Sequence, residues 1–255
     1  FYFDLMEHSF RNDINCPTVI LSKEFKRVTR LKNKECSFLT FLEGKCLKKW
    51  NSNDCYNIGI ILGKFHKINQ KFNLIKKNHF SISEWQNLFK RCESRMDEIV
   101  INFKDVLRKE LTFIKKNWPE DLPKGIIHAD LFPDNVLFKR KKISGIIDFY
   151  FSCYDSLSYD LAILINAWSF VNNKFNAEFF RALIEGYQSI RSLNKNEKKS
   201  FNILLRGASI RFLMTRIYDF FNTNENSQFI KKNPIDYLKI LDFHRKLRSF
   251  EDYIE

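Results

Sequence analysis

The sequence predicts an α+β protein in which a small antiparallel β part precedes a mainly helical part. Two patterns point to this fold class. Short apolar and β-branched runs separated by charged turns fill residues 19–42, which is typical of antiparallel strands. From residue 53 onward most apolar residues recur every three or four positions, the period of amphipathic helices. We expect the boundary near residues 43–50, so that residues 1–46 form the first part and residues 47–255 the second.

The first part should open with an amphipathic helix. Phe1, Leu5 and His8 fall near one face of a helix over residues 1–10, and the segment 12–17, which ends in proline, should end that helix. The runs that follow are connected by short charged segments, which favours an antiparallel meander. The three expected strands are 19–21, 27–31 and 36–42.

Helical spacing dominates the second part. The expected helices cover residues 53–71, 83–117 as one or two helices, 161–168, 175–190, a stretch containing 208–219, and 236–247. The core candidates of the second of these stretches are Phe89, Leu107, Leu111 and Phe113. The lone His66 at the end of the first helix is expected to bond a neighbour rather than to act in catalysis.

A loop between short apolar strands interrupts these helices. Ile126 and Ile127 form one apolar run, residues 136–138 a second and residues 143–147 a third, and a charged turn over residues 139–142 separates the last two. Polar residues of this segment therefore stand at the ends of strands.

Three of those polar residues have spacings that phosphoryl transfer needs. Asp130 and Asn135 lie five positions apart, and Asp148 closes the next apolar strand, which is the order found in the catalytic loop and metal-binding aspartate of kinases. Asp130 is the expected catalytic base for an attacking alcohol. Asn135 and Asp148 are expected to bind the Mg²⁺ of an ATP substrate through hard oxygen atoms. Taken singly, such residues are usually turn residues or caps, but three matches in order favour the chemical interpretation.

The sequence around Asp130, Asn135 and Asp148 resembles that of a known group of enzymes. The segments 128–135, 147–150 and 159–162 resemble the aminoglycoside phosphotransferase and choline kinase superfamily, and the longer segments 146–155 and 159–168 resemble its homoserine kinase branch. The resemblance implies a bilobal protein-kinase-like fold. It also implies ATP-dependent phosphorylation of the hydroxyl of L-homoserine to O-phospho-L-homoserine, a step towards threonine. Kinases of choline, methylthioribose or aminoglycosides are the nearer alternatives.

By the same resemblance, residues 38–44 correspond to the hinge whose backbone meets adenine, which makes Phe41 and Leu42 the expected nucleotide-binding residues. None of the seven glycines precedes Gly44, so a glycine-rich phosphate loop and the strand bearing its partner lysine do not appear. We therefore expect a fragment that lacks one β-rich segment of the family, or an incomplete gene product. An inactive kinase-like binding protein is the alternative that this absence leaves open.

Further charged residues are candidates for binding the substrate or for supporting the site. Arg211 and Arg216 are five positions apart, which makes them partly co-facial on a helix, and an arginine fork is the usual complement of an amino-acid carboxylate. Both could instead form structural salt bridges. Asp160 is expected to cap a helix or to brace the catalytic loop, and Asp155 to contact metal or the substrate amine, or to sit in a turn.

Composition and charge indicate which kinds of partner the protein is expected to bind. The sequence contains neither a long apolar span nor an export signal, and its six cysteines lack paired spacing, so we expect a cytoplasmic protein with reduced thiols and no membrane partner. A net charge of +13 raises nucleic acid as a partner, but lysine is spread along the whole chain rather than gathered in a patch. We therefore expect a small-molecule substrate and no nucleic acid, and the sequence leaves the oligomeric state open.

Overall fold

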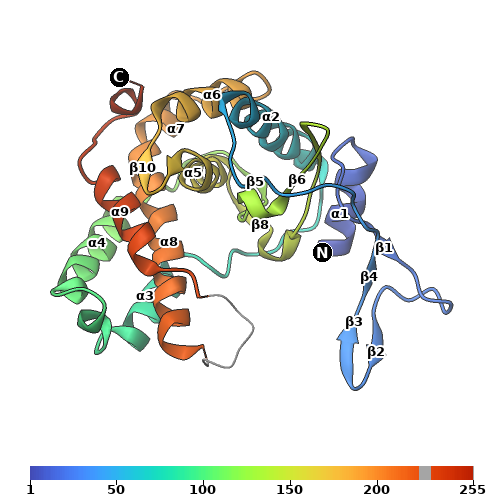
Figure 1. Ribbon diagram of the computed structural model, residues 1–255, viewed down its shortest axis with the longest axis horizontal. Helices are drawn as coiled ribbons and strands as arrows, with labels where there is room; N and C mark the ends of the chain where they lie inside the picture. Colours follow the sequence, from blue (N-terminus) through green and yellow to red (C-terminus); the bar gives the residue numbers. More distant parts are fainter. Residues whose placement is uncertain (224–230, 255) are drawn as a thin grey trace.

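The structure is a computed structural model that describes residues 1–223 and 231–254. Figure 1 shows a narrow β-rich arm that projects from a larger body made mainly of helices. The expected order along the chain, β-rich first and helical second, is confirmed.

The arm is a nested pair of ladders, and the expected meander is wrong. After α1 (Tyr2–Arg11), the strand β1 (Val19–Ile20) pairs with β4 (Phe38–Leu39), and β2 (Thr29–Leu31) pairs with β3 (Lys34–Cys36) between them. Two successive residues with positive φ, Lys32 at 47° and Asn33 at 62°, form the tight turn that closes the inner hairpin. The strand β1 therefore skips its nearest neighbour in sequence and pairs with the last strand of the arm.

Short antiparallel ladders carry the segment that the sequence singled out. The strand β5 (Lys124–Ile127) pairs with β8 (Cys153–Ser156), and β6 (Val136–Lys139) pairs with β7 (Lys142–Ile146). The loop of interest joins β5 to β6, and Asp148 follows β7. One further short pair is β9 (Phe170–Val171) with β10 (Lys174–Phe175).

The helical body is built around α5 (Leu157–Trp168), which is almost entirely buried and lies centrally in Figure 1. A helix that is apolar on all sides belongs inside a core. The other helices are α2 (Ser52–Ile68), α3 (Ile82–Cys92), α4 (Phe103–Asn117), α6 (Ala177–Gln188), α7 (Lys195–Lys199), α8 (Phe201–Asn222) and α9 (Pro234–His244). Single turns of 3-10 helix are η1 (Asn69–Lys71), η2 (Met96–Glu98), η3 (Pro133–Asn135), η4 (Phe149–Phe151) and η5 (Glu251–Tyr253).

One predicted core residue lies elsewhere. Phe89, Leu107 and Leu111 are buried as expected, but the side chain of Phe113 is 43% exposed. Two residues along a helix correspond to about 200°, so Phe113 points away from the face of α4 that buries Leu111. Its ring instead lies 4.1 Å from the guanidinium of Arg206.

Glycine brings α2 and α6 unusually close together. A Cβ atom on Gly186 would lie 2.0 Å from the carbonyl oxygen of Tyr56, and one on Gly59 would lie 2.3 Å from that of Leu183. Because backbone atoms on each helix occupy the space that a side chain would need, these two positions require glycine at the observed separation. Among the described residues, no helix is long and apolar enough to span a bilayer.

Candidate active site

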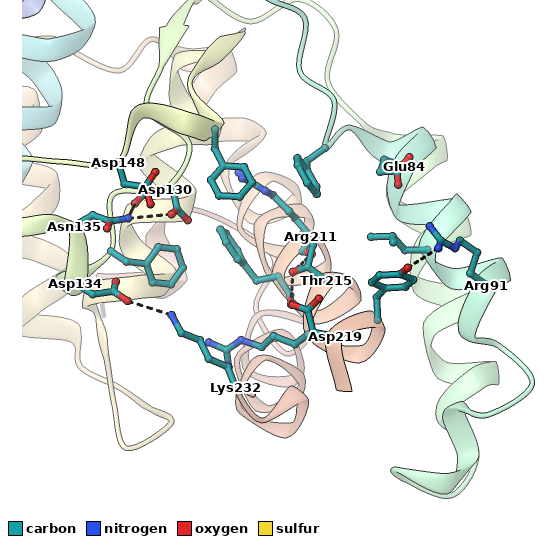
Figure 2. Close-up of a pocket in the computed structure, with 17 residues that line it drawn as sticks. Glu84, Arg91, Asp130, Asp134, Asn135, Asp148, Arg211, Thr215, Asp219 and Lys232 are labelled. Atoms are coloured by element: carbon teal, nitrogen blue, oxygen red, sulfur yellow. Dashed lines mark hydrogen bonds and ion pairs between the residues drawn. The ribbon is translucent and has the colours of Figure 1, made fainter. Parts of the chain in front are cut away.

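A cavity of about 700 Å³ lies between the β5–β6 loop, α8 and α3. Figure 2 shows Asp130, Asn135 and Asp148 together on one side of this cavity, as the sequence predicted. Arg211 and Arg216 line it from α8. The structure therefore gathers five of the seven predicted site residues around one space.

The two remaining predicted residues lie apart from this cavity. The side chain of Phe41 is 89% exposed. Leu42 packs near Gly145, where a Cβ would lie 2.7 Å from its Cδ1 atom. Neither residue lines the cavity that holds Asp130.

The side chain of Asp160, on α5, holds the backbone at the start of the β5–β6 loop. Its Oδ2 atom accepts a hydrogen bond from the backbone N–H of His128 at 2.7 Å, and its Oδ1 atom accepts one from that of Ala129 at 2.8 Å. Ala129 has a φ of 65°, a conformation that is uncommon for residues with a side chain and is held here by these contacts. The prediction that Asp160 braces the loop is confirmed. The helix cap at this position is Ser156 instead.

Asp160 is itself held by a buried histidine. His66 Nε2 lies 3.0 Å from Asp160 Oδ2, and His66 Nδ1 lies 2.8 Å from the hydroxyl of Tyr187. Burial alone would raise the pKa of Asp160, but the hydrogen bond from His66 and the neighbouring His128 hold that pKa below its ordinary value. The carboxylate is therefore charged at neutral pH, and the structural role expected for His66 is confirmed.

His128 connects the loop to the strand that leads to Asp148. Burial lowers the pKa of His128, so its ring is neutral. Its Nε2 atom lies 3.1 Å from the carbonyl oxygen of Ile147, and the backbone N–H of Ile147 donates to the carbonyl of Asn135 at 3.0 Å. These contacts set the spacing between the loop and Asp148.

Asp130 is oriented by Asn135. The Nδ2 atom of Asn135 donates to the backbone oxygen of Asp130 at 2.7 Å and to its Oδ2 atom at 3.0 Å. Burial raises the pKa of Asp130 to about 7; the charge of Arg211 opposes this rise, and those of Asp148 and Asp134 add to it. A carboxylate whose pKa lies near the working pH can both orient a hydroxyl and accept its proton.

The oxygen atoms of Asn135 and Asp148 fit a divalent cation. Because Asn135 uses its Nδ2 atom to hold Asp130, its Oδ1 atom is the one available to a metal. Asp148 lies two residues after the end of β7, has a φ of 64° and presents an exposed carboxylate to the cavity. Among the described residues no cluster of three histidine, cysteine or acidic side chains forms a metal cage. Mg²⁺ in kinases needs none, since one or two protein oxygens and the substrate phosphates hold it.

Other charged residues at the cavity were not predicted. Lys232 Nζ lies 3.3 Å from Asp134 Oδ2, while Asp219 lines the cavity from α8 and Glu84 lines it from α3 (Figure 2). In the sequence, Lys232 stands two positions before Pro234, and that proline indicates only that a helix begins nearby. No local pattern could reveal this gathering, because the contributing elements are far apart along the chain.

Asp155 lies outside the cavity. It is part of β8, not a turn, and its Oδ2 atom accepts from Asn78 Nδ2 at 2.7 Å. This contact ties β8 to the segment that precedes α3.

Comparison with known proteins agrees with this geometry. Residues 1–193 match the profile described as the phosphotransferase enzyme family, APH. The homoserine kinase of Rhizobium rhizogenes is 39% identical over 254 residues, which cover 99% of this chain and 79% of the relative. That of Bartonella henselae is 40% identical over 253 residues, with 99% and 79% covered.

Solved structures share the fold. The amicoumacin kinase hAmiN, solved with AMP-PNP, Ca²⁺ and Ami, has a TM-score of 0.67 at 16% identity and covers 98% of this chain and 76% of its own. An ethanolamine kinase of Plasmodium vivax has a TM-score of 0.65 at 16% identity, with 98% and 73% covered. The protein-kinase-like α+β fold is thereby confirmed, and the chain belongs to the APH phosphotransferase enzyme family.

Proposed function

We propose that the protein transfers the γ-phosphoryl group of ATP to the hydroxyl of L-homoserine, giving O-phospho-L-homoserine and ADP. The observation that carries the chemistry is the contact of Asp130 with Asn135 beside Asp148 at one cavity. The choice of acceptor is supported by relatives named homoserine kinase at 37–40% identity over nearly the whole chain. The use of ATP in amino-acid synthesis supports a cytoplasmic location for the protein.

Asp130 acts on the acceptor hydroxyl. Its carboxylate orients the hydroxyl, the oxygen attacks the γ-phosphorus of ATP, and the bond from that phosphorus to the ADP oxygen breaks. The hydroxyl proton passes to Asp130. Asn135 and Asp148 would hold Mg²⁺, which when bound neutralises charge on the phosphate oxygens.

The other candidate residues would bind the nucleotide and the acceptor. Phe41 and Leu42 would meet the adenine ring through the hinge backbone. Arg211 and Arg216 give the acceptor side of the cavity a positive charge that suits a carboxylate.

A panel of acceptors with radiolabelled ATP tests this function. L-homoserine, choline, methylthioribose and an aminoglycoside would each be incubated with the full chain and Mg²⁺, and labelled product would be counted. We expect transfer to L-homoserine at a kcat/KM far above that of the other three. Turnover of choline without turnover of homoserine would contradict the choice of acceptor. A complete lack of transfer would favour the inactive binding protein.

A further inference from the structure

Arg211 is a buried cation without a carboxylate partner among the described residues. Its side chain leaves the middle of α8 and is only 2% exposed, yet no described acidic group lies within ion-pair distance of its guanidinium. The other largely buried arginines behave differently. Arg206 is 12% exposed and pairs with Glu110 at 2.7 Å, and Arg191 is 14% exposed and pairs with Glu197 at 2.9 Å.

The contacts that Arg211 does make satisfy it only in part. Its Nη1 atom donates to the carbonyl oxygen of Ala129 at 2.7 Å. The rings of Phe80, Phe151 and Phe212 lie 5.5, 5.4 and 4.7 Å from the guanidinium carbon. Aromatic faces attract a cation, but they and the nearby hydroxyl of Tyr159 cannot accept all four further N–H donors of a guanidinium. A buried charge left in this condition is costly, which indicates that an anion completes the site.

The cavity is the place from which that anion would come. Arg211 lines the same cavity as Asp130, and Figure 2 shows the two side chains on neighbouring walls. We infer that Arg211 binds the carboxylate of the acceptor, so that this site selects alcohols that bear a carboxylate. The inference rests on the proposed transfer to a small alcohol and specifies the class of that alcohol.

The position of Arg211 suits the length of a hydroxy acid. The guanidinium bonds to the residue directly before the catalytic base, so its free donors lie close to the point where a hydroxyl would meet Asp130. In homoserine only Cα, Cβ and Cγ separate the carboxylate carbon from the hydroxyl oxygen. One small molecule can therefore satisfy both residues together.

The other cations of the cavity already have acceptors. Arg216 donates to the carbonyl oxygen of Asn233 at 3.0 Å and lies 3.4 Å from Asp236. Lys232 lies 3.3 Å from Asp134, and Arg91 donates to the hydroxyl of Tyr218. A positive acceptor such as choline or ethanolamine would instead meet the uncompensated charge of Arg211 in a site of low dielectric, where like charges repel strongly.

The test compares two acceptors that differ only in the carboxylate. L-homoserine and 3-aminopropan-1-ol share the hydroxyl and the amine. We expect the wild-type protein to prefer homoserine by a factor of about 10³ or more, because a site built around a polar group rejects the analogue that lacks it. Arg211→Met should lower kcat/KM for homoserine by roughly 10²- to 10³-fold more than that for 3-aminopropan-1-ol, because only homoserine loses a carboxylate partner. Arg95→Met, at an exposed arginine outside the cavity, is the matched control and should change neither.

The ratio of kcat/KM for homoserine to kcat/KM for 3-aminopropan-1-ol shows whether Arg211 binds the carboxylate or only supports the β5–β6 loop. Loss of the bond to Ala129 affects both acceptors equally, so an equal fall in both kcat/KM values after Arg211→Met would overturn the inference. Should this variant fail to fold, Arg211→Lys is the second test, because lysine keeps the positive charge but lacks the planar guanidinium that binds a carboxylate through two donors. We expect this variant to raise the KM for homoserine and not the KM for 3-aminopropan-1-ol.

The wild-type protein supplies an independent outcome. Equal use of the two acceptors by the wild type would overturn the inference without any variant. If the protein phosphorylates homoserine and both Arg211 variants keep the wild-type ratio of the two kcat/KM values, the role of Arg211 is overturned and the proposed function stands. Arg211-dependent transfer to another hydroxy acid, without transfer to homoserine, would overturn the proposed acceptor and leave the inference standing.

Discussion

At the scale of single residues, the proposed proton transfer depends on how burial and neighbouring charges set the pKa of Asp130. An ordinary aspartate is a weak base because its pKa lies near 4. Here burial and two nearby carboxylates raise the pKa to about 7, while Arg211 limits the rise. A base of this strength accepts a proton more readily and is still partly ionised at neutral pH.

Replacing Asp130 by asparagine should separate chemistry from binding. The amide keeps the shape and an oxygen for the hydrogen bond from Asn135, but it cannot take the proton of the acceptor. We expect kcat to fall by about 10²-fold or more, with the dissociation constant of ATP nearly unchanged. Steady-state kinetics and titration calorimetry with ATP measure the two quantities. Loss of cooperative unfolding in the variant would show instead that Asp130 is structural.

Residue patterns predicted this centre but not all of its surroundings. Asp130, Asn135 and Asp148 could be predicted because each follows an apolar run at a fixed distance along one short stretch of chain. Lys232 and Asp219 reach the same cavity from distant segments, and nothing in their local sequence distinguishes them from solvated charges. Their placement depends on how α8 and the residues before α9 pack.

At the scale of elements, α9 is joined to α5 and α8 through a buried histidine. His244 Nε2 lies 2.8 Å from Asn166 Oδ1, and His244 Nδ1 lies 3.0 Å from the hydroxyl of Tyr253, which in turn accepts from Asn202 at 2.9 Å. The neutral ring thus donates on one side and accepts on the other. Burial, and then the charge of Arg206, lower the pKa of His244 to about 3.

This histidine should make stability depend on pH. The unfolded chain takes up a proton at His244 as the pH falls through about 6.5, whereas the folded chain resists until about 3. The free energy of unfolding should therefore be highest above pH 6.5 and should fall towards pH 3 by up to about 1.4 kcal/mol per pH unit from this group. Urea unfolding from pH 7 to pH 4.5 would measure the slope. His244→Gln should be less stable at pH 7 but have a shallower slope, and parallel curves would contradict the assignment.

The contact between α2 and α6 depends on a missing side chain. In Gly186→Ala the new Cβ would overlap the backbone oxygen of Tyr56, so the helices would have to separate. We expect the free energy of unfolding to fall by about 2–4 kcal/mol, although alanine favours a helix. Urea denaturation measures this loss. Glu185→Ala, at the exposed neighbouring position, should change stability by less than about 0.5 kcal/mol.

Comparable losses in the two variants would mean that the helices tolerate the larger separation. The length and type of α2 and α6 could be predicted from their apolar spacing. Their close approach could not, since a glycine inside a helical pattern gives no indication of which backbone it will meet.

At the scale of the whole molecule, two tryptophans join the chain that leaves the β arm to the helical body and to the catalytic loop. Trp50 Nε1 donates to the carbonyl oxygen of Trp168 at 2.8 Å, and Trp168 Nε1 donates to that of Leu131 at 2.9 Å. Their ring centroids are 5.0 Å apart. The connection passes close to the expected boundary between residues 46 and 47.

Two conservative variants should distinguish the halves of this connection. Trp50→Phe should lower the free energy of unfolding by about 1–3 kcal/mol with little change in kcat, because it removes one partly buried hydrogen bond away from the cavity. Trp168→Phe should lower both, since Leu131 directly follows Asp130. Thermal unfolding and steady-state kinetics would be measured on each variant. An unchanged kcat in Trp168→Phe would mean that the loop keeps its position without this bond.

The sequence by itself determined the order of β and helical parts, the type of most helices and the three polar residues Asp130, Asn135 and Asp148 of the proposed site, because apolar periodicity and fixed spacing are local properties of a chain. Pairing within the β arm, the exposure of Phe113 and the uncompensated charge of Arg211 were decided only by the tertiary structure. Each of these depends on which distant segment lies opposite: β4 opposite β1, Arg206 against Phe113, and three aromatic rings around Arg211 where a carboxylate would otherwise be expected. Packing sets such juxtapositions, and no short stretch of sequence records them.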